Sequence, residues 1–589
     1  MTNLEISELL RAIAASYKIK DEEKYKYQII AYERAADAIE HSSSEVKDLW
    51  DEGKLEDIAG VGKNISQHLS EIFSKGRSKH FEEIMKDLPK QMFDLMLIPG
   101  IGAKSAYKLV KNLNIKERDP IKQLEIFAKK GLISKIEGFG KDSEKDILNS
   151  INKVKGVTKR YLLPYAENIA NDIILWIRKE KSVKKVDALG SLRRKVSTVG
   201  DIDIAVASDN SKAVIEHFIK YPKVKRVIDK GSKSASILIF PNIRIDLKVQ
   251  SFKSYGSLLQ HFTGSKHHNI ALREYSLKMG YSLSEYGIRD KRSRKLLHFA
   301  SEEDFYGKLG LQWIPPELRE NSGEIEFSKN NKLPLLVNIK DIKSDFHIHS
   351  NFNTETSHDL GLSTIEEIIK KSCDLKYEYF VLAEHNPSHS KHSKKEIIDL
   401  LKKKKEFIDK INYSLVKNMK NRIKYIFNSL EVDILANGKI AIPEESLNYI
   451  DFALVSIHSS FRMNRSNMTK RVLNALSYEK VKIFAHPTAR KINEREGIEL
   501  EWDKIFDFCK KYDKWLEINA DPMRLDLPDF LVREAIKKSI KLTLGTDAHH
   551  VDHMDNMKYA VYVARRGWTR KEDIINTRNY NEFKLLLKI

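Results

Sequence analysis

The stretch GSLRRKVSTVGDID, residues 190–203, decides how this chain is interpreted. It ends in Asp201 and Asp203, two carboxylates one residue apart. On a strand, the two-residue period places both side chains on one face of the sheet. Paired carboxylates bind divalent metal ions, and two such ions suit an in-line attack on a phosphate. Gly190 and Ser191 add a backbone N–H and a hydroxyl that can hold phosphate oxygens. The stretch therefore predicts metal-dependent phosphoryl chemistry.

A third carboxylate and an arginine extend this prediction. Asp246 lies in the apolar strand-like segment RIDLKV, residues 244–249, where a lone carboxylate is costly unless it coordinates a cation. The alternative is an aspartate pair that only forms a turn, and it does not explain Asp246. Arg194 follows the Gly-Ser pair and can bind a triphosphate with both arms of its guanidinium group. Strands are also expected on either side of a turn at Pro241–Asn242.

The composition bounds the class of protein. At 589 residues the chain is too long for one core, so several domains are expected. Its net charge of +20 favours nucleic acid as a partner, although runs such as Lys402–Lys405 also fit a solvated helix face. We find no membrane-spanning apolar run and no signal peptide. Only Cys373 and Cys509 are cysteines, which predicts no disulfide framework and favours a cytoplasmic location.

The first third contains a weak internal repeat of a glycine turn followed by a helix. Its copies are IAGVGKNISQHL at 58–69, IPGIGAKSAYKLV at 98–110 and IEGFGKDSEKDIL at 136–148. They resemble helix-hairpin-helix motifs, in which the helix N-terminus holds a DNA phosphate without reading sequence. The third copy carries Glu137 and Asp142 beside its turn, which favours a structural role. The residues expected to contact DNA are Gly60, Gly62, Gly100, Gly102 and Lys104.

The segment HFTGSKHHNIALR, residues 261–273, offers a shaped surface to a nucleotide. Phe262 and Gly264 would form a small wall beside a sugar or base. Asn269 and Arg273 are spaced at i and i+4, so they share a helix face and can reach the minor-groove edge of a base pair. Taken alone, this segment is only a turn followed by a helix.

Together, the Gly-Ser pair, the carboxylates and segment 261–273 resemble family X DNA polymerases, the group that contains animal polymerase beta. The resemblance covers residues 1 to about 318 and implies fingers, palm and thumb after a helical domain. It implies that Asp201 and Asp203 bind two Mg²⁺ (or Mn²⁺) ions and that Asp246 binds the catalytic one and accepts the primer 3′-hydroxyl proton. It also implies a nucleotide site, made of Gly190, Ser191, Arg194, Phe262, Gly264, Asn269 and Arg273.

Two positions depart from that family. The sugar-facing wall of polymerase beta opens with tyrosine, whereas this chain has His261, which affects discrimination against ribonucleotides. The lysine that serves polymerase beta as a Schiff-base nucleophile matches His68, and a second hairpin lysine matches Asn64. Imidazole cannot form that Schiff base, and Lys63 would point elsewhere on the helix. We therefore expect weak or absent 5′-deoxyribose phosphate lyase activity.

In the C-terminal third, apolar strands that alternate with helical patterns repeatedly end in residues of metal-ligand type. In a βα barrel the carboxyl ends of the strands meet at one mouth, so these side chains can converge. A single histidine of this kind is usually structural, but a recurrence at so many strand ends favours a metal centre. The residues are His347, His349, His385, Glu431, His458, His486, Asp547 and His549.

This arrangement resembles the PHP (polymerase and histidinol phosphatase) domain over residues 341 to about 575. The resemblance implies a distorted barrel that hydrolyses phosphoesters with up to three ions, Mn²⁺ or Zn²⁺. It also implies an acidic ligand shortly after the first histidine pair. Asp359 is our choice for this ligand, with Glu355 as a rival and His358 as a third candidate. Glu384, which precedes His385, is left outside the ligand set.

The order of modules, a family X polymerase followed by a PHP domain, resembles bacterial and archaeal PolX proteins. The expected fold is therefore multidomain, part α+β and part α/β. The expected domains are a helical helix-hairpin-helix domain at 1–95, fingers at 96–155, a nucleotidyltransferase palm at 156–255, a thumb at 256–318, a linker at 319–340 and a PHP metallohydrolase at 341–589.

The expected enzyme is a monomeric DNA polymerase that fills short gaps during base excision repair. Its expected partners are gapped or primed double-stranded DNA and deoxynucleoside triphosphates. No association with a membrane is expected. The PHP centre is expected to act as a 3′→5′ exonuclease or phosphoesterase. An alternative is a nucleotidyltransferase for RNA or a small molecule with a PHP phosphatase, and a third class is a DNA-binding scaffold without catalysis.

Overall fold

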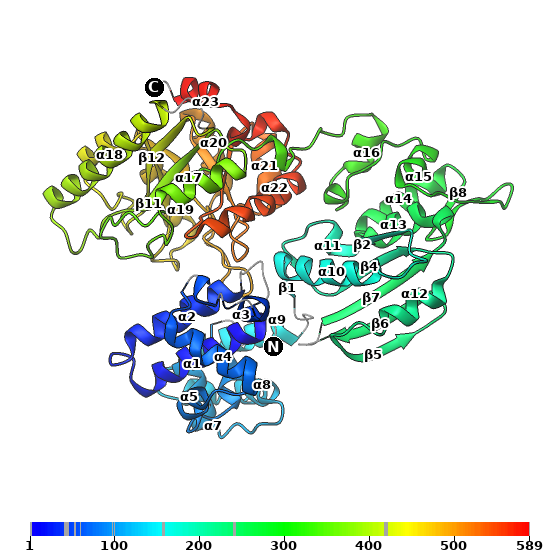
Figure 1. Ribbon diagram of the computed structural model, residues 1–589, viewed down its shortest axis with the longest axis horizontal. Coiled ribbons are helices and arrows are strands. Elements are labelled where there is room, and N and C mark those ends of the chain that lie inside the picture. Colours follow the sequence, from blue (N-terminus) through cyan, green and yellow to red (C-terminus); the bar gives the residue numbers. More distant parts are fainter. Residues whose placement is uncertain are drawn as a thin grey trace. The chain divides into compact units, whose positions relative to one another are not determined.

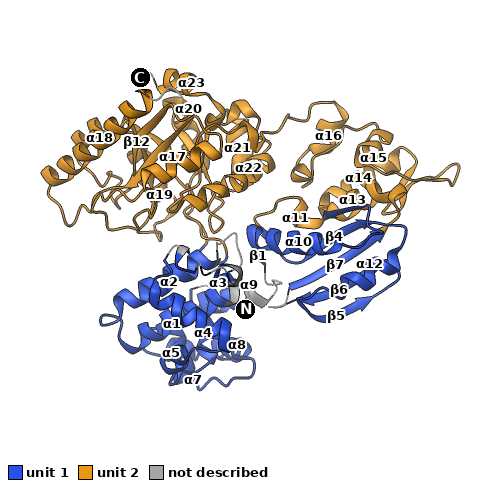
Figure 2. Cartoon of the chain, in the orientation of Figure 1, with its two compact units in different colours: residues 1–187, 198–249, 493–495 blue, residues 188–197, 250–492, 496–589 orange. Residues whose placement is uncertain are grey.

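The protein is described here by a computed structural model with two compact units, which Figure 2 shows in different colours. Unit 1 comprises residues 1–187, 198–249 and 493–495, and unit 2 comprises residues 188–197, 250–492 and 496–589. The structure describes residues 3–40, 46–51, 53, 55–58, 60–96, 98, 100–155, 160–239, 243–417 and 422–587. The turn expected at Pro241–Asn242 lies outside the described residues. No described helix has the length and apolar character that crossing a membrane requires.

Unit 1 begins with short helices that enclose two separate hydrophobic cores. One core runs from Ile6 to Phe81, and the other contains Ala15 together with residues between Met92 and Ile151. The helices are α1 (Asn3–Asp21), α2 (Lys26–Glu40), α3 (Val46–Asp51), α4 (Lys63–Lys75), α5 (Lys79–Met85), α6 (Gln91–Met96), α7 (Ala103–Leu113), α8 (Pro120–Lys129) and α9 (Lys141–Lys155).

The three glycine turns of the sequence repeat share one backbone geometry. The first glycine of each turn, at 60, 100 and 138, has a φ of 80°, 89° and 87° respectively, a region open to glycine at low cost. The second glycine of each accepts a hydrogen bond from the amide four residues later, at 3.0, 2.9 and 3.0 Å. In the third copy the Glu144 carboxylate accepts the amides of Ile133 and Ser134, so this turn carries an internal anion.

The palm region of unit 1 is a five-stranded sheet in the order β2-β4-β7-β6-β5, and β5, β6 and β7 run antiparallel to their neighbours within this trio. A two-stranded sheet pairs β1 with β3. The elements of this region are β1 (Tyr161–Leu162), α10 (Leu163–Ile177), β2 (Lys185–Ala188), β3 (Thr198–Val199), β4 (Ile202–Ala207), α12 (Ser211–Phe218), β5 (Val224–Lys230), β6 (Ser234–Ile239) and β7 (Ile243–Gln250).

The deciding stretch 190–203 is only partly a strand. Its first residues form a helical turn, α11 (Gly190–Arg193), which starts at a Gly190 φ of 59°. Strand β4 begins at Ile202, so Asp201 directly precedes the strand and Asp203 lies within it. Only Asp203 is therefore part of the strand, although Asp201 lies close enough to repel its carboxylate.

Unit 2 first forms an α/β region around one small core that contains Leu272, Phe305 and Trp568. A three-stranded antiparallel sheet has the order β10-β9-β8. The elements are α13 (Tyr255–Thr263), α14 (Lys266–Lys278), β8 (Tyr281–Ser284), β9 (Gly287–Asp290), β10 (Leu296–Leu297), α15 (Glu302–Lys308) and α16 (Glu324–Lys329).

The segment 319–340, expected to be a linker, is instead packed against this core. Arg319 is fully buried, and its guanidinium donates to Glu302 at 2.6 Å. Glu324 is also buried and contacts the His268 imidazole at 2.6 Å. The polar composition suggested a solvated connection, but these charges are buried because each has a charged or hydrogen-bonding partner.

The C-terminal part of unit 2 is a parallel sheet of six strands in chain order, with helices between the strands (Figure 1). The strands are β11 (Tyr379–His385), β12 (Tyr425–Asp433), β13 (Phe452–Ser456), β14 (Val481–Phe484), β15 (Trp515–Asn519) and β16 (Leu542–Gly545). The helices are α17 (Ile365–Asp374), α18 (Lys394–Lys417), α19 (Arg465–Leu476), α20 (Trp502–Tyr512), α21 (Asp529–Lys537), α22 (Met557–Arg566) and α23 (Tyr580–Leu587).

This sheet curls because one extended segment joins both of its edges. Ile348 forms parallel bridges with Leu382 of β11 and with Ala548 just after β16. The Phe346 amide also donates to Leu544 of β16 at 3.2 Å. The segment around Ile348 therefore acts as a seventh, closing strand, and the carboxyl ends of the strands face one mouth, as in a βα barrel.

Candidate functional site

The first candidate centre consists of three aspartates on adjacent strands of unit 1. Asp201 and Asp203 come from the start of β4, and Asp246 lies on the neighbouring β7. Burial, followed by repulsion from Asp201 and Asp246, raises the pKa of Asp203 to about 7. Asp246 is held by Arg244, whose Nε lies 2.9 Å from its carboxylate, and by the hydroxyl of Ser236. The carboxylates lie close enough to repel one another.

Such a donor set fits a divalent cation. Oxygen ligands from several carboxylates are what Mg²⁺ and Mn²⁺ prefer. The nearby cations Lys248 and Arg244 lower the pKa of Asp203, but they do not offset burial and the repulsion from the other two aspartates together. The residues present therefore fit the metal that the sequence predicted.

The raised pKa predicts an unusual pH dependence of the metal-free protein. Folded Asp203 keeps its proton up to about pH 7, whereas the unfolded chain releases it near the ordinary value of 3.8. The folded state binds more protons in this window, so its stability falls as the pH rises from about 4 to about 7. The loss should reach a few kcal/mol, because each pKa unit corresponds to about 1.4 kcal/mol. Unfolding midpoints recorded in a chelator across this range measure it.

The matched variant for that measurement is Asp203→Asn, which keeps the shape of the side chain and cannot ionise. Its unfolding midpoint should change less between pH 4 and pH 7 than that of the unmodified protein. Identical pH profiles for the two proteins would contradict the assignment of this proton to Asp203.

In unit 2, Arg194 and Gly264 lie together. The Arg194 guanidinium donates to the Glu320 carboxylate at 2.9 Å and to the Thr263 carbonyl at 2.5 Å. A Cβ on Gly264, whose φ is 69°, would lie 3.1 Å from the guanidinium, so glycine permits this approach. Arg566 of α22 also donates to Glu320, at 3.0 Å. Gly190 and Ser191 form the start of α11, four and three residues before Arg194.

The other nucleotide-site candidates of unit 2 lie on α13 and α14. The Asn269 amide donates to the His261 carbonyl at 2.7 Å and accepts from Gln260 at 2.9 Å, which ties the two helices together. Phe262 packs edge-on against the His261 ring, with the ring centroids 4.8 Å apart. Arg273 follows on the exposed face of α14.

His68 occupies the position in the first hairpin where polymerase beta has its nucleophilic lysine. The His68 ring lies on α4 and stacks on the ring of His80 at a centroid distance of 4.3 Å. Burial and the neighbouring His80 lower the pKa of His68. His80 in turn hydrogen-bonds the Tyr17 hydroxyl at 2.9 Å. The position is thus occupied by a mostly neutral imidazole rather than an amine.

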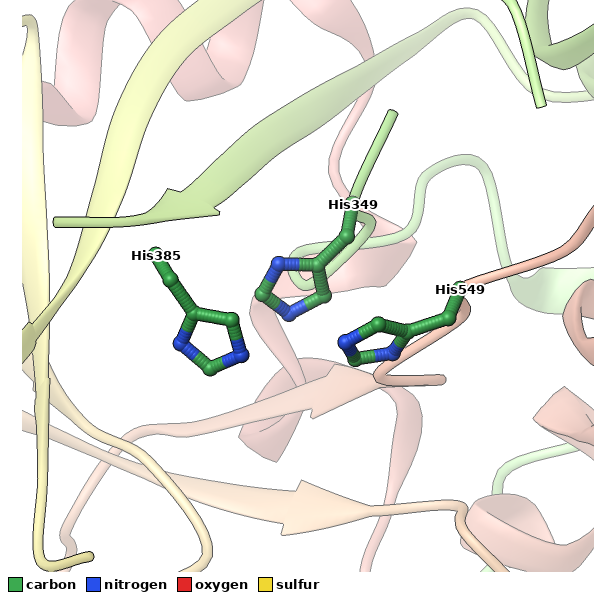
Figure 3. Close-up of side chains that lie close together, drawn as sticks. All are labelled: His349, His385 and His549. Carbon is green, nitrogen blue, oxygen red and sulfur yellow. The ribbon is translucent and has the colours of Figure 1, made fainter. Parts of the chain in front are cut away.

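The second candidate centre lies at the mouth of the parallel sheet in unit 2. Figure 3 shows three of its imidazoles, from His349, His385 and His549, facing one another from different segments. Among the described residues, four overlapping groups of side chains could each hold a metal ion. They are His349–His385–His549, His358–His385–His458, His347–His349–Glu431–Asp547, and Glu431–His458–His486.

Glu431 is the hub of this centre. One or other of its carboxylate oxygens lies 2.7–3.6 Å from a ring nitrogen of five histidines, at positions 347, 349, 385, 458 and 486. Despite complete burial, those imidazoles hold the pKa of Glu431 well below its usual range. Burial and His549 lower the pKa of His349 to about 3, so its imidazole is in the neutral form that binds metal.

Unpaired polar atoms show that this centre fits metal ions. Within the described part of the chain, both ring nitrogens of His349 and one Glu431 oxygen are buried without a hydrogen-bond partner. The same is true of a ring nitrogen on each of His347, His385 and His486. Buried polar groups are otherwise nearly always paired, so this concentration points to absent cations.

Asp359, Glu355 and His358, the three candidates for the metal ligand that follows His347 and His349 in the sequence, have different surroundings in the structure. His358 lies in a group with His385 and His458, whereas Asp359 belongs to none of the groups found among the described residues. Glu355 pairs instead with His392 at 2.7 Å. Asp359 therefore stays a prediction, and His358 is favoured because its imidazole lies in a group with those of His385 and His458.

Two carboxylates that the sequence analysis missed hold the imidazoles in place. Glu517 of β15 bonds the other ring nitrogen of His347 at 2.7 Å. Asp433 contacts both His358 and His458 at 2.7 Å. Such partners fix the tautomer and orientation of metal-binding histidines. Glu517 lies near the end of an apolar strand, WLEIN, so the pattern that found Glu431 could have found it. Glu384 accepts hydrogen bonds from Ser350 and belongs to none of the four groups found among the described residues.

Comparison with known proteins agrees with this architecture. Residues 258–320 match the family model of the DNA polymerase beta thumb, and residues 1–78 match that of a helix-hairpin-helix domain. The rat (Rattus norvegicus) DNA polymerase lambda is 21% identical over 349 residues, which cover 54% of this chain and 56% of that protein. These domains, with the three aspartates, define a family X DNA polymerase.

The relationship to one protein extends over the whole chain. The DNA polymerase/3′-5′ exonuclease PolX of Bacillus subtilis (strain 168) is 30% identical over 591 aligned residues, covering 100% of both chains. The chain therefore belongs to the PolX family, and it is an enzyme. The expected class of enzyme is confirmed by this similarity.

Proposed function

We propose that this enzyme fills short gaps in DNA during base excision repair and removes 3′-terminal nucleotides at its second centre. The observation that carries the proposal is the presence of two chemically different sets of side chains in one chain of the PolX family. Three carboxylates in unit 1 suit nucleotide addition, and the imidazole-rich centre in unit 2 suits phosphodiester hydrolysis.

At the first centre, Asp201 and Asp203 would hold Mg²⁺ or Mn²⁺ ions and Asp246 would hold one of them. The bound ions would neutralise the triphosphate charge and lower the pKa of the primer 3′-hydroxyl. Asp246 would accept the proton of that hydroxyl, and its bond to Arg244 orients it for this role. Transfer then depends mainly on the positioning of the reacting groups.

The nucleotide would be held by groups of unit 2. Arg194 and the Gly190–Ser191 turn would bind the triphosphate, the arginine with its guanidinium and the turn with backbone amides and the serine hydroxyl. Glu320, which now holds Arg194, would compete with that triphosphate. Phe262 and Gly264 would face the sugar. Asn269 and Arg273 of α14 would contact the new base pair.

The second centre would act as a 3′→5′ exonuclease or phosphoesterase within a distorted, PHP-type βα barrel. Up to three Mn²⁺ or Zn²⁺ ions would supply an activated water and stabilise the charge on the phosphate. The sequence analysis chose all of the proposed ligands except His358, which it gave as a third candidate. The proposed ligands are His347, His349, His358, His385, Glu431, His458, His486, Asp547 and His549. Glu517 and Asp433 would orient the histidines.

DNA would be held along its backbone by the first two hairpins, through Gly60, Gly62, Gly100, Gly102 and Lys104. Gly62 and Gly102 are N-caps with nearly equal φ of −77° and −79°, and each precedes a helix of more than ten residues. These caps offer amides and a helix dipole to a phosphate. The thumb and hairpin matches support DNA over RNA or a small molecule as substrate.

Two glycine variants separate folding from DNA contact. Gly60→Ala should destabilise the protein by about 1–2 kcal/mol, since φ is +80° and the new Cβ would lie 3.3 Å from the backbone of α2. Gly102→Ala should leave stability unchanged, because its Cβ would meet no described atom within 4 Å. Its methyl group would stand where a phosphate approaches the backbone, so affinity for gapped DNA should fall about tenfold, as if one charged hydrogen bond were lost. Thermal unfolding and fluorescence anisotropy measure the two effects, and unchanged DNA affinity in Gly102→Ala would refute the contact.

The proposed function is tested with the full chain on DNA that has a one-nucleotide or five-nucleotide gap, compared with an open primed template. Extension should depend on Mg²⁺ or Mn²⁺ and favour the gapped DNA. Without nucleotides, 3′ ends should be shortened when Mn²⁺ is present, and metal analysis of the purified protein should find tightly bound ions. Incorporation confined to RNA substrates would support the alternative nucleotidyltransferase instead.

A further inference from the structure

A buried arginine beside the second centre has no role in the proposed ligand set. Arg524 lies in the loop between β15 and α21, and its side chain is only 13% exposed. Its Nε lies 3.7 Å from the carboxylate of Asp547 and 3.6 Å from that of Asp521. Asp547 belongs to the group that contains His347, His349 and Glu431. The guanidinium therefore borders the proposed metal centre.

The backbone of Arg524 is firmly held. Its amide donates to the Asp521 carbonyl at 2.8 Å, and its own carbonyl accepts from Arg490 Nε at 2.7 Å. Two residues later, the Asp526 carboxylate accepts the Thr488 amide at 3.0 Å. The loop thus fixes where the side chain starts, and little ordering would remain when a ligand binds.

The guanidinium group of Arg524 has N–H donors that form no hydrogen bond within the described structure. In the described structure, its Nε and one terminal nitrogen are buried and make no hydrogen bond. The guanidinium group is charged at any ordinary pH, and the carboxylates of Asp547 and Asp521 lie beside it. The neighbouring Arg490 differs, because its guanidinium donates hydrogen bonds to the backbone carbonyls of Arg524 and Leu525. A merely structural arginine would be expected to resemble Arg490.

Buried donors without partners are costly, and a guanidinium presents two parallel N–H groups that match a phosphate. At 3.6–3.7 Å the two aspartates balance its charge without filling its donors. A ligand that completes the site must carry acceptor oxygens and reach the same mouth as the metal group. A phosphodiester meets both conditions.

We propose that Arg524 binds the non-bridging oxygens of the phosphodiester that the second centre cleaves. This inference rests on the proposed hydrolytic function of that centre. Arg524 would orient the reacting phosphate and stabilise the negative charge that grows on it in the transition state. It would act as a substrate-binding group and not as a metal ligand.

The test compares Arg524→Met and Arg524→Lys with the unmodified full chain. Arg524→Met removes the charge at similar length, and Arg524→Lys keeps the charge but loses the paired donors. Two substrates are used, single-stranded DNA and bis(p-nitrophenyl) phosphate, which has one phosphate only. Arg524→Met should lower hydrolysis of both about 10²–10³-fold, as expected for loss of one transition-state donor. Arg524→Lys should recover part of this loss.

Other measurements separate this role from a structural one. Bound metal and gap extension should be unchanged in Arg524→Lys, and inorganic phosphate should bind more weakly to it in calorimetry. Arg570→Met is the matched control, because that side chain is 58% exposed, and it should behave as the unmodified protein. If Arg524→Met fails to fold, Arg524→Lys decides.

Three outcomes would overturn the inference. Unmodified kinetics in Arg524→Lys and Arg524→Met would show that the guanidinium binds no substrate. A loss confined to DNA would place it on a neighbouring phosphate instead. Loss of bound metal in Arg524→Lys would make it structural. Hydrolysis that is lost in His347→Ala but kept in Arg524→Met refutes this inference alone, whereas hydrolysis that survives His347→Ala refutes the proposed function and the inference with it.

Discussion

Asp203→Ala is expected to abolish nucleotide addition and to leave 3′-end digestion intact. Burial, followed by repulsion from both Asp201 and Asp246, raises the pKa of Asp203 to about 7. Without it, the remaining carboxylates cannot hold two cations in place around a triphosphate. Metal stabilisation of a phosphoryl transition state amounts to several kcal/mol, so extension should fall at least about 10³-fold. Extension of a gapped primer under single-turnover conditions measures this loss.

Asp229→Ala provides the control, because Asp229 is an exposed carboxylate on strand β5 of the same sheet. It should extend primers as the unmodified protein does. Equal extension by Asp203→Ala and Asp229→Ala would remove the first centre from the reaction. Loss of both extension and digestion in Asp203→Ala would indicate a folding defect, which the unfolding midpoint would reveal.

The second large effect is expected for Glu431→Gln. This substitution keeps the shape of the side chain but removes the charge that five imidazoles share at distances of 2.7–3.6 Å. The neutral amide also presents donors to ring nitrogens that should bind metal. Bound metal should fall strongly, and 3′-end digestion should drop at least about 10³-fold for the same reason as above. Metal analysis and digestion of a labelled 3′ end are the readouts.

Gap extension should persist in Glu431→Gln, because the three aspartates of the first centre are untouched. Glu445→Gln, at an exposed glutamate after β12, is the matched control. Digestion that continues at the normal rate in Glu431→Gln would assign the exonuclease to another part of the chain. Normal metal content together with lost digestion would instead make Glu431 a group that acts on the substrate.

Local sequence patterns predicted the features that depend only on residues close together in the chain. The aspartate pair, the glycine turns and the strand ends with histidine each need only a few adjacent residues, and the periodicity of strands and helices relates their faces. The sequence repeat corresponds to similar backbone conformations, since Gly60 and Gly100 both have positive φ and Gly62 and Gly102 both cap a helix, with φ of −77° and −79°. The succession of βα units also followed from the sequence.

Predictions failed where a residue acts through partners that are distant in sequence. The segment 319–340 was interpreted as a linker because its polar composition is visible, whereas the partner of Glu324, His268, lies 56 residues earlier. Spacing alone also did not show that His358 lies with His385 and His458, which come from distant segments. Glu517 was missed because its role depends on a hydrogen bond with His347, which is 170 residues away in the sequence.

By itself, the sequence was enough to predict two metal-dependent phosphoryl centres, because the ligand types and their strand-end positions are local properties. It also determined the likeness to family X polymerases, through Asp201, Asp203 and Asp246. Only the tertiary structure decided which histidines converge on Glu431, and that Arg524 lies beside them with unfilled donors. The reason is physical: burial, pairing and pKa depend on which distant segments the folded sheet brings together.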